Sequence, residues 1–227
     1  NATISNNTVS LKTAATAGIW TAIENVIGAT PAANTVNINN NTVQNCSFSG
    51  VTSPAFLGIS NTSTAANVNI NSNTVNSIVV SNAAATMINN TGTGIVNSSI
   101  SNNTVSGITN GAASGTLRGI SVGNAVNGTF NTNIVDGMSF TAAASTGSID
   151  GMASVGAGQS NTFSGNIVRN LSVPATGTIN GIREFGSSTG TKTIQNNQIY
   201  NFSTTAGGAG GATFNGILAN LGATYVI

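Results

Sequence analysis

One short motif returns seven times along this chain with unchanged internal spacing. An apolar residue is followed three positions later by Asn and two positions after that by another apolar residue, as in Ile38…Asn41…Val43. Successive copies begin 34, 32, 30, 30, 33 and 31 residues apart. A period of this size indicates a repeat array in which each copy is one structural unit stacked on the next. The asparagines of the seven copies are Asn7, Asn41, Asn73, Asn103, Asn133, Asn166 and Asn197.

The repeat extends beyond the motif on both sides. Three residues after its second apolar position stands another apolar residue, from Cys46 to Phe202; the first copy departs, with Lys12 there and Leu11 beside it. Directly before this position lie turn-forming residues, namely Asn45, Ser77, Gly107, Gly137, Asn170 and Asn201. Ten to twelve residues before each later copy comes one more apolar position, occupied by Ile27, Ile59, Ile88, Ile120, Met152 and Ile182.

Short apolar segments between Asn and Gly turns favour a β-solenoid over helices. Both residue types tolerate the left-handed backbone conformation that a sharp corner needs, and no helical apolar stripe persists along the chain. We therefore predict an all-β parallel β-helix of about seven coils, with about 32 residues per coil. Residues 1–227 form a single array, and loops such as 141–147 and 204–211 absorb the differences in coil length.

Stacked coils place equivalent residues about 4.8 Å apart, so each repeat position becomes a ladder along the axis. The motif asparagines are expected to form one ladder, with amide bonded to amide. Like charges at this spacing repel by about 0.9 kcal/mol even in water, which explains why only 4% of residues are charged.

The few charges agree with the predicted register. Asp136 and Arg169 occupy equivalent positions in neighbouring coils, and so do Arg118 and Asp150. Both pairs are expected to form exposed inter-coil ion pairs, each contributing under about 1 kcal/mol.

The segments Ile38–Val43 and Ile100–Val105 resemble right-handed parallel β-helix repeats. They are similar to the Asn/Thr-rich arrays of very large secreted surface proteins of Bacteroidetes-like bacteria, and the resemblance spans essentially the whole chain. It implies the right-handed coil and an extracellular or cell-surface location. It carries over no catalytic residue, although the wider β-helix family includes pectate lyases, phage tailspikes and adhesins.

The composition argues against a catalytic or metal-binding site. Histidine is absent, Cys46 is the single cysteine, and the four acidic residues are Glu24, Asp136, Asp150 and Glu184. The acids are read as structural or surface charges, since Glu184 adjoins Arg183 and the two aspartates occupy different repeat positions. Cys46 is read as a core residue because it lies in an apolar ladder. We expect no enzyme, no cofactor and no metal site.

Partners follow from the same observations. A net charge of +1 offers no footprint for nucleic acid, and no apolar run is long enough to span a membrane. Ile227 stands where an eighth copy would begin, so the array is predicted to continue at both ends, into further coils or by end-to-end self-association. The first hypothesis for function is therefore a structural one: a stalk, adhesin segment or fibre.

The alternative is recognition of a glycan, or of ice. The residues that flank the leading apolar position are small and polar, and they are expected to form a flat outer double column. Its members are Thr3/Ser5, Asn37/Asn39, Asn69/Asn71, Ser99/Ser101, Thr129/Asn131, Thr162/Ser164 and Thr193/Gln195.

Overall fold

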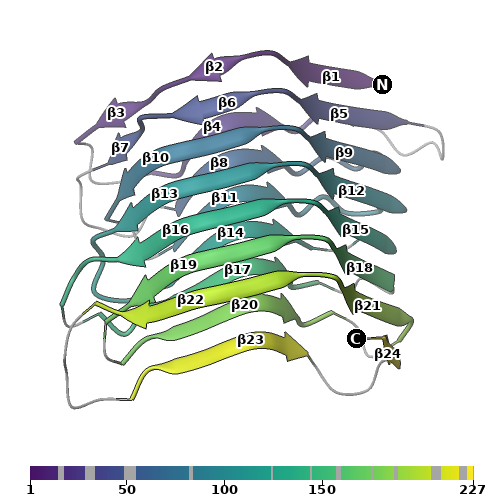
Figure 1. The fold of residues 1–227 in the computed structure, drawn as a ribbon. Coiled ribbons are helices and arrows are strands. Elements are labelled where there is room, and N and C mark those ends of the chain that lie inside the picture. The colour runs from purple at the N-terminus through teal and green to yellow at the C-terminus, as the bar shows by residue number, and fades with distance from the viewer. Residues whose placement is uncertain are drawn as a thin grey trace.

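The computed structural model describes residues 1–14, 18–28, 34–48, 55–81, 84–123, 125–143, 145–156, 160–174, 176–186, 189–205, 211–219 and 224–226, the last segment by its backbone alone. Within these ranges every regular element is a β-strand. The strands form three parallel sheets, to which the chain contributes in turn as it passes from coil to coil, and Figure 1 shows the coils as tiers of a parallel β-solenoid. The predicted fold class is confirmed.

Sheet A carries the leading apolar residue of each motif. Its strands, in spatial order, are β1 (Ala2–Ser5), β5 (Thr35–Asn39), β9 (Asn67–Asn71), β12 (Asn97–Ser101), β15 (Asn127–Asn131), β18 (Ser160–Ser164), β21 (Thr191–Gln195) and β24 (Thr224–Val226). Its register aligns the motifs residue by residue, with Ile38 opposite Ile70 and Ile100 opposite Phe130.

Sheet B begins just after the motif asparagine. Its strands are β2 (Thr8–Val9), β6 (Thr42–Gln44), β10 (Thr74–Val80), β13 (Thr104–Asn110), β16 (Ile134–Phe140), β19 (Ile167–Val173) and β22 (Gln198–Thr204), with the short β3 (Lys12–Thr13) and β7 (Ser47–Phe48) beside them. In the first coil Lys12 pairs with Ser47, and Leu11 therefore stands at the level of Cys46 and takes the apolar position that Lys12 leaves.

Sheet C closes each coil. Its strands are β4 (Trp20–Asn25), β8 (Ala55–Asn61), β11 (Ala84–Asn90), β14 (Thr116–Val122), β17 (Ser148–Ser154), β20 (Thr178–Glu184) and β23 (Thr213–Ala219). In Figure 1 sheets A and B cross the near side from right to left, and sheet C returns behind them from left to right as the chain descends. This is the right-handed sense that crossovers between parallel strands favour.

Left-handed backbone conformations make the corners. The residue before the motif asparagine has positive φ in every coil, including Asn40 (58°), Thr132 (52°) and Gly165 (64°). The turn formers predicted within sheet B also have positive φ, from 54° at Asn45 to 71° at Gly137. Asn and Gly enter this region at the lowest cost, which explains their abundance here.

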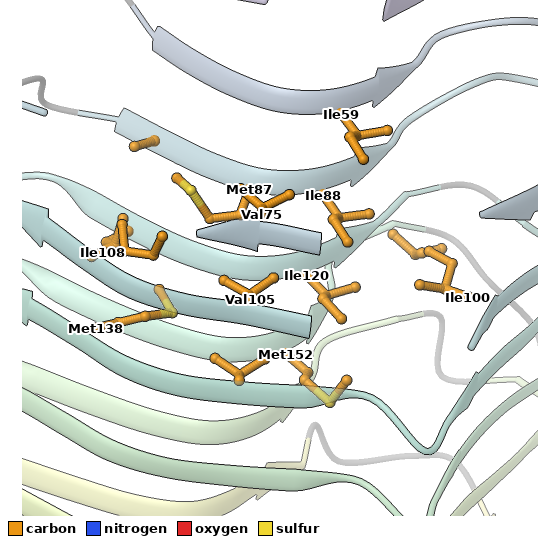
Figure 2. Packing of buried hydrophobic residues seen from close by; sticks show 14 of the residues in the cluster. Ile59, Val75, Met87, Ile88, Ile100, Val105, Ile108, Ile120, Met138 and Met152 are labelled. Atoms are coloured by element: carbon orange, nitrogen blue, oxygen red, sulfur yellow. The ribbon is translucent and has the colours of Figure 1, made fainter. Parts of the chain in front are cut away.

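Apolar ladders fill the interior. Ile59, Ile88, Ile120 and Met152 lie one above another in Figure 2, and each is fully buried. The rings of Phe130 and Phe163 stack with centroids 4.2 Å apart. One prediction is wrong: Ile23, not Ile27, stands opposite Ile59, and Ile27 is 73% exposed. The prediction failed because both isoleucines fit the apolar pattern. Each of Ile23 and Ile27 is followed by a polar or small residue, and the first coil is irregular. The eighth-copy position Ile227 lies outside the described residues.

Sheet C bends where it approaches sheet B, and glycine makes the approach possible. A Cβ at Gly119 would lie 2.5 Å from the carbonyl oxygen of Gly151, and one at Gly181 would lie 2.6 Å from a methyl group of Ile199. Gly58 is equally confined, whereas Ala22 and Met87 stand at this place in two other coils. At these glycines the backbone of sheet C packs directly against side chains of sheet B, with Val135 beside Gly119 and Ile199 beside Gly181.

We predict that Gly151→Ala lowers the free energy of unfolding by about 1–3 kcal/mol or more, since overpacking a rigid core forces backbone shifts. The new Cβ would meet Val168 Cγ1 at 2.5 Å and the Gly181 carbonyl oxygen at 2.6 Å. Gly216→Ala is the matched control, because a Cβ at this equivalent position has no atom within 4 Å. Urea denaturation of both variants checks the prediction, and equal effects would contradict it.

Candidate functional site

The buried asparagine ladder is the most regular polar feature of the molecule. Each motif asparagine bonds to the next through Nδ2 and Oδ1, at distances between 2.9 and 3.1 Å. The links run without a gap from Asn7 to Asn197, and the five asparagines between Asn41 and Asn166 are at most 1% exposed. The ladder predicted from the repeat is confirmed.

Every amide inside this ladder is saturated. Asn103 Nδ2 donates to Asn133 Oδ1 and to the carbonyl oxygen of Ile70, while Asn103 Oδ1 accepts from Asn73 Nδ2 and from the Asn73 main-chain N–H. One side chain thus makes four hydrogen bonds that join its own coil to both neighbours. Aspartate or leucine would leave buried donors or acceptors unpaired, which explains why asparagine recurs.

The ladder is also polar in direction. Each Nδ2 donates toward the C-terminal coil, and each Oδ1 accepts from the N-terminal coil. Any coil stacked below must therefore present an acceptor, and any coil stacked above must present donors.

A second, shorter ladder runs inside the molecule at the end of sheet C. Asn25 donates to Asn61 and Asn61 donates to Asn90, both over 2.7 Å, and Asn90 then donates to Ser98 Oγ. This ladder was not predicted from the sequence. The signal was an Asn two residues after each of Ile23, Ile59 and Ile88, but the wrong choice of Ile27 concealed it.

On the outer face of sheet B, Arg169 lies in an ion pair with Asp136. Nη2 is 2.8 Å from Asp136 Oδ2, and Arg169 Nη1 donates to the Tyr200 hydroxyl. Burial raises the pKa of Asp136, but hydrogen bonds from Asn170 and Arg169, and the charge of Arg169, outweigh it and leave the pKa below its usual value. Both side chains are partly exposed, as the register predicted.

The pair between Arg118 and Asp150 is present, but the expectation that it is exposed is wrong. Asp150 is 0% exposed, and its Oδ2 accepts from Arg118 Nε at 3.2 Å and from Arg183 Nη1 at 3.0 Å. Its Oδ1 accepts from Asn180 Nδ2 at 2.8 Å. Arg183 thus belongs to Asp150 and not to its sequence neighbour Glu184, because adjacent residues of a strand face opposite sides.

Glu184 lies inside the solenoid, so of the two predicted roles it has the structural one and is not a surface charge. It is 0% exposed and stands 3.6 Å from Lys192 Nζ, which is 1% exposed. The carboxylate accepts from Asn161 Nδ2 and from the Gly186 N–H. Burial raises the pKa of Glu184 above its usual 4.5, although Lys192 and the hydrogen bonds oppose the rise.

Lys192 was not singled out from the sequence, although a signal existed. It stands two residues before Ile194, where other coils place Val36 and Val68 in the core. Alternation along the strand would have turned it inward.

Cys46 is buried, as expected of a core residue. Burial raises the pKa of its thiol, and the Leu11 N–H donates to Sγ. Across the described residues, no three His, Cys, Asp or Glu side chains gather in a way that would hold a metal ion. A cavity of about 220 Å³ opens beside Asn1, Ala2, Gly28 and Ala65, and its walls are mostly apolar.

The outer double column of sheet A is present. The register places Asn37, Asn69, Ser99 and Thr129 in line, and all four are partly exposed. The column has local amide bonds of its own, since Asn69 Nδ2 donates to Asn37 Oδ1 at 2.9 Å.

Comparison of the chain with protein-family models, with curated proteins and with solved structures finds no match in any of the three. The class of protein is therefore defined by the fold alone, a parallel β-solenoid with buried asparagine ladders. Over the described ranges, no helix has the length and apolar character needed to cross a membrane.

We predict that Asn103→Ala lowers the free energy of unfolding by about 3–5 kcal/mol. The change removes four hydrogen bonds and leaves the Asn73 N–H, the Ile70 carbonyl and the Asn133 amide without their partner. Asn97→Ala is the control, because Asn97 is exposed where it hydrogen-bonds to the asparagines of the two neighbouring coils. This change is expected to lower the free energy of unfolding by under about 1 kcal/mol. Chemical denaturation measures both, and a similar loss in both variants would refute the role assigned to burial.

A second prediction concerns the inner ion pair. Lys192→Met alone leaves the Glu184 carboxylate buried without its cation, and should cost about 3–5 kcal/mol, whereas Glu184→Gln with Lys192→Met should recover most of that loss. Arg169→Met, which breaks the outer pair, is the control and should cost under about 1 kcal/mol.

The pH dependence provides an independent check. The pKa of the Glu184 carboxyl group is higher in the folded chain than its usual value of 4.5. Its contribution to stability is therefore fully present below pH 4.5, and it is lost as the pH rises through the folded-state pKa. The Lys192→Met variant should therefore lose stability as pH rises above 4.5, and the double variant should lose this slope. Denaturation across this pH range would contradict the assignment if both variants behaved alike.

Proposed function

We propose that this chain is a structural repeat segment of a secreted bacterial surface protein, and that it serves as a stalk or as the subunit of a self-stacking extracellular fibre. The observation that carries the proposal is the directional asparagine ladder. Its bonding pattern repeats from one inner coil to the next, so a further coil of the same kind could join the stack through the same bonds.

The two ends of the ladder are complementary in chemistry. Asn7 at the first coil presents Oδ1, an acceptor for which no donor is found among the described residues. Asn197 at the other end directs its amide to the carbonyl oxygen of Phe163, and no second acceptor for that amide is found among the described residues. Head-to-tail stacking of coils joins donors to acceptors, whereas head-to-head stacking would oppose like groups.

Composition supports a load-bearing role over a chemical one. Neutral side chains avoid repulsion at ladder spacing, and the core consists of continuous apolar columns. Nearest-neighbour contacts of this kind add stability with each coil, as in other repeat arrays. The resemblance to large surface proteins remains the support for a secreted, cell-surface location.

Self-stacking is tested by sedimentation and electron microscopy of the purified chain at rising concentration. The expected result is rods longer than one chain, with a population that grows with concentration. Asn7→Ala should reduce rod length at least severalfold because it removes the end acceptor, whereas Asn97→Ala, an exposed mid-stack change, should not. Monomers at every concentration would refute self-stacking.

A further inference from the structure

Charge is concentrated in one part of this nearly uncharged molecule. Seven of its nine charged residues lie between Arg118 and Lys192, and only Lys12 and Glu24 lie elsewhere. Three of the seven, Arg118, Asp150 and Arg183, meet on the outer face of sheet C, across β14, β17 and β20. Arg118 and Arg183 lie on the two strands that flank β17, so the single carboxylate of Asp150 pairs with two cations.

The bend of sheet C brings these residues together. Asp150 follows the buried Ile149 and precedes the confined Gly151, so alternation directs it to the outer face. Arg183 lies between the buried Ile182 and Glu184 and shares that face. At the bend, outward side chains from either side of Gly151 converge, and the Asp150 carboxylate becomes fully enclosed by its donors.

The result is a rigid cationic group with a net charge of +1. Asp150 is saturated by Arg118, Arg183 and Asn180, so it holds the guanidinium groups in place and has no capacity for a ligand cation. Arg118 is 28% exposed and Arg183 26%, and each uses one nitrogen toward Asp150. Among the described residues, no acceptor meets the remaining guanidinium N–H groups, and one of these, Arg183 Nε, is buried.

An exposed aromatic ring lies beside this group. The Arg183 guanidinium carbon is 4.5 Å from the centroid of the Phe185 ring, and Phe185 is 45% exposed. Stacking on the ring further restricts Arg183. A flat apolar surface next to fixed guanidinium donors matches a molecule that has an apolar ring face and an anionic substituent.

We propose that Arg118, Arg183 and Phe185 form a binding site for an acidic saccharide, with its carboxylate or sulfate group on the arginines and its sugar ring against Phe185. Guanidinium forks bind planar carboxylate and tetrahedral sulfate through paired hydrogen bonds. Asp150 acts as a positioning residue. The site lies on the wall of the solenoid, so it is independent of end-to-end stacking.

Isothermal titration calorimetry with three probes tests the site: an oligogalacturonate, a sulfated oligosaccharide, and a neutral oligosaccharide of equal length. Binding of at least one acidic probe is expected, weakened by salt, with at least tenfold lower affinity for the neutral probe. The two acidic probes distinguish a carboxylate ligand from a sulfate ligand. Failure of both acidic probes to bind, or equal binding of the neutral one, would overturn the proposal.

Variants locate the binding. Arg118→Gln and Arg183→Gln should each lower affinity at least tenfold, and Phe185→Ala at least fivefold. Arg169→Gln is the matched control, because Arg169 also pairs with an aspartate across coils but lies on sheet B. An equal loss in the control would refute the site. Phe185→Ala decides the matter if the arginine variants unfold, since the exposed ring takes no part in the ion pairs, and unchanged affinity in it would refute the site.

Discussion

The hydrogen bond between stacked asparagine side chains is the interaction on which the rest of this structure depends. A parallel solenoid must turn a corner after each short strand, and the backbone at that corner cannot satisfy its own polar groups within the sheets. In this protein the motif asparagine accepts from the main-chain N–H of the preceding coil and donates to a carbonyl of that coil, as at Asn103. Polar groups buried at the corner are thereby paired, which removes a penalty of about 1–3 kcal/mol for each.

The same interaction constrains everything around it. Amide-to-amide bonding requires coils in strict register, and strict register places Ile above Ile and Phe130 above Phe163 in the core. Register also explains the low charge. If a charged residue recurred at one repeat position, it would lie directly against a like charge in the next coil. Seven of the nine charged residues are matched with opposite charges, and Asp150 and Glu184 are also enclosed by several donors.

The few charged residues are informative because removing a charge from water is energetically costly. A glutamate and a lysine inside an apolar solenoid must overcome large desolvation penalties, and their pairing only offsets this. The outer cluster of Arg118, Asp150 and Arg183 is different, because its two arginine side chains are partly exposed and Arg183 stacks on the Phe185 ring. The inner pair is enclosed in the core, and the outer cluster is the place where we propose that an acidic saccharide binds.

Much of this architecture was determined by sequence alone, because a ladder repeats in space what the chain repeats in order. The coil period, the motif asparagine ladder, the turn positions such as Asn45 and Gly137, and the pairing of Asp136 with Arg169 all followed from equal spacing. Tertiary structure decided what depends on the shape of the coil. The fold brought Arg183 to Asp150, and it placed Glu184 beside Lys192 in the core. Spacing states which residues lie in the same column, but burial depends on how three sheets close around that column, and only the folded chain contains that information.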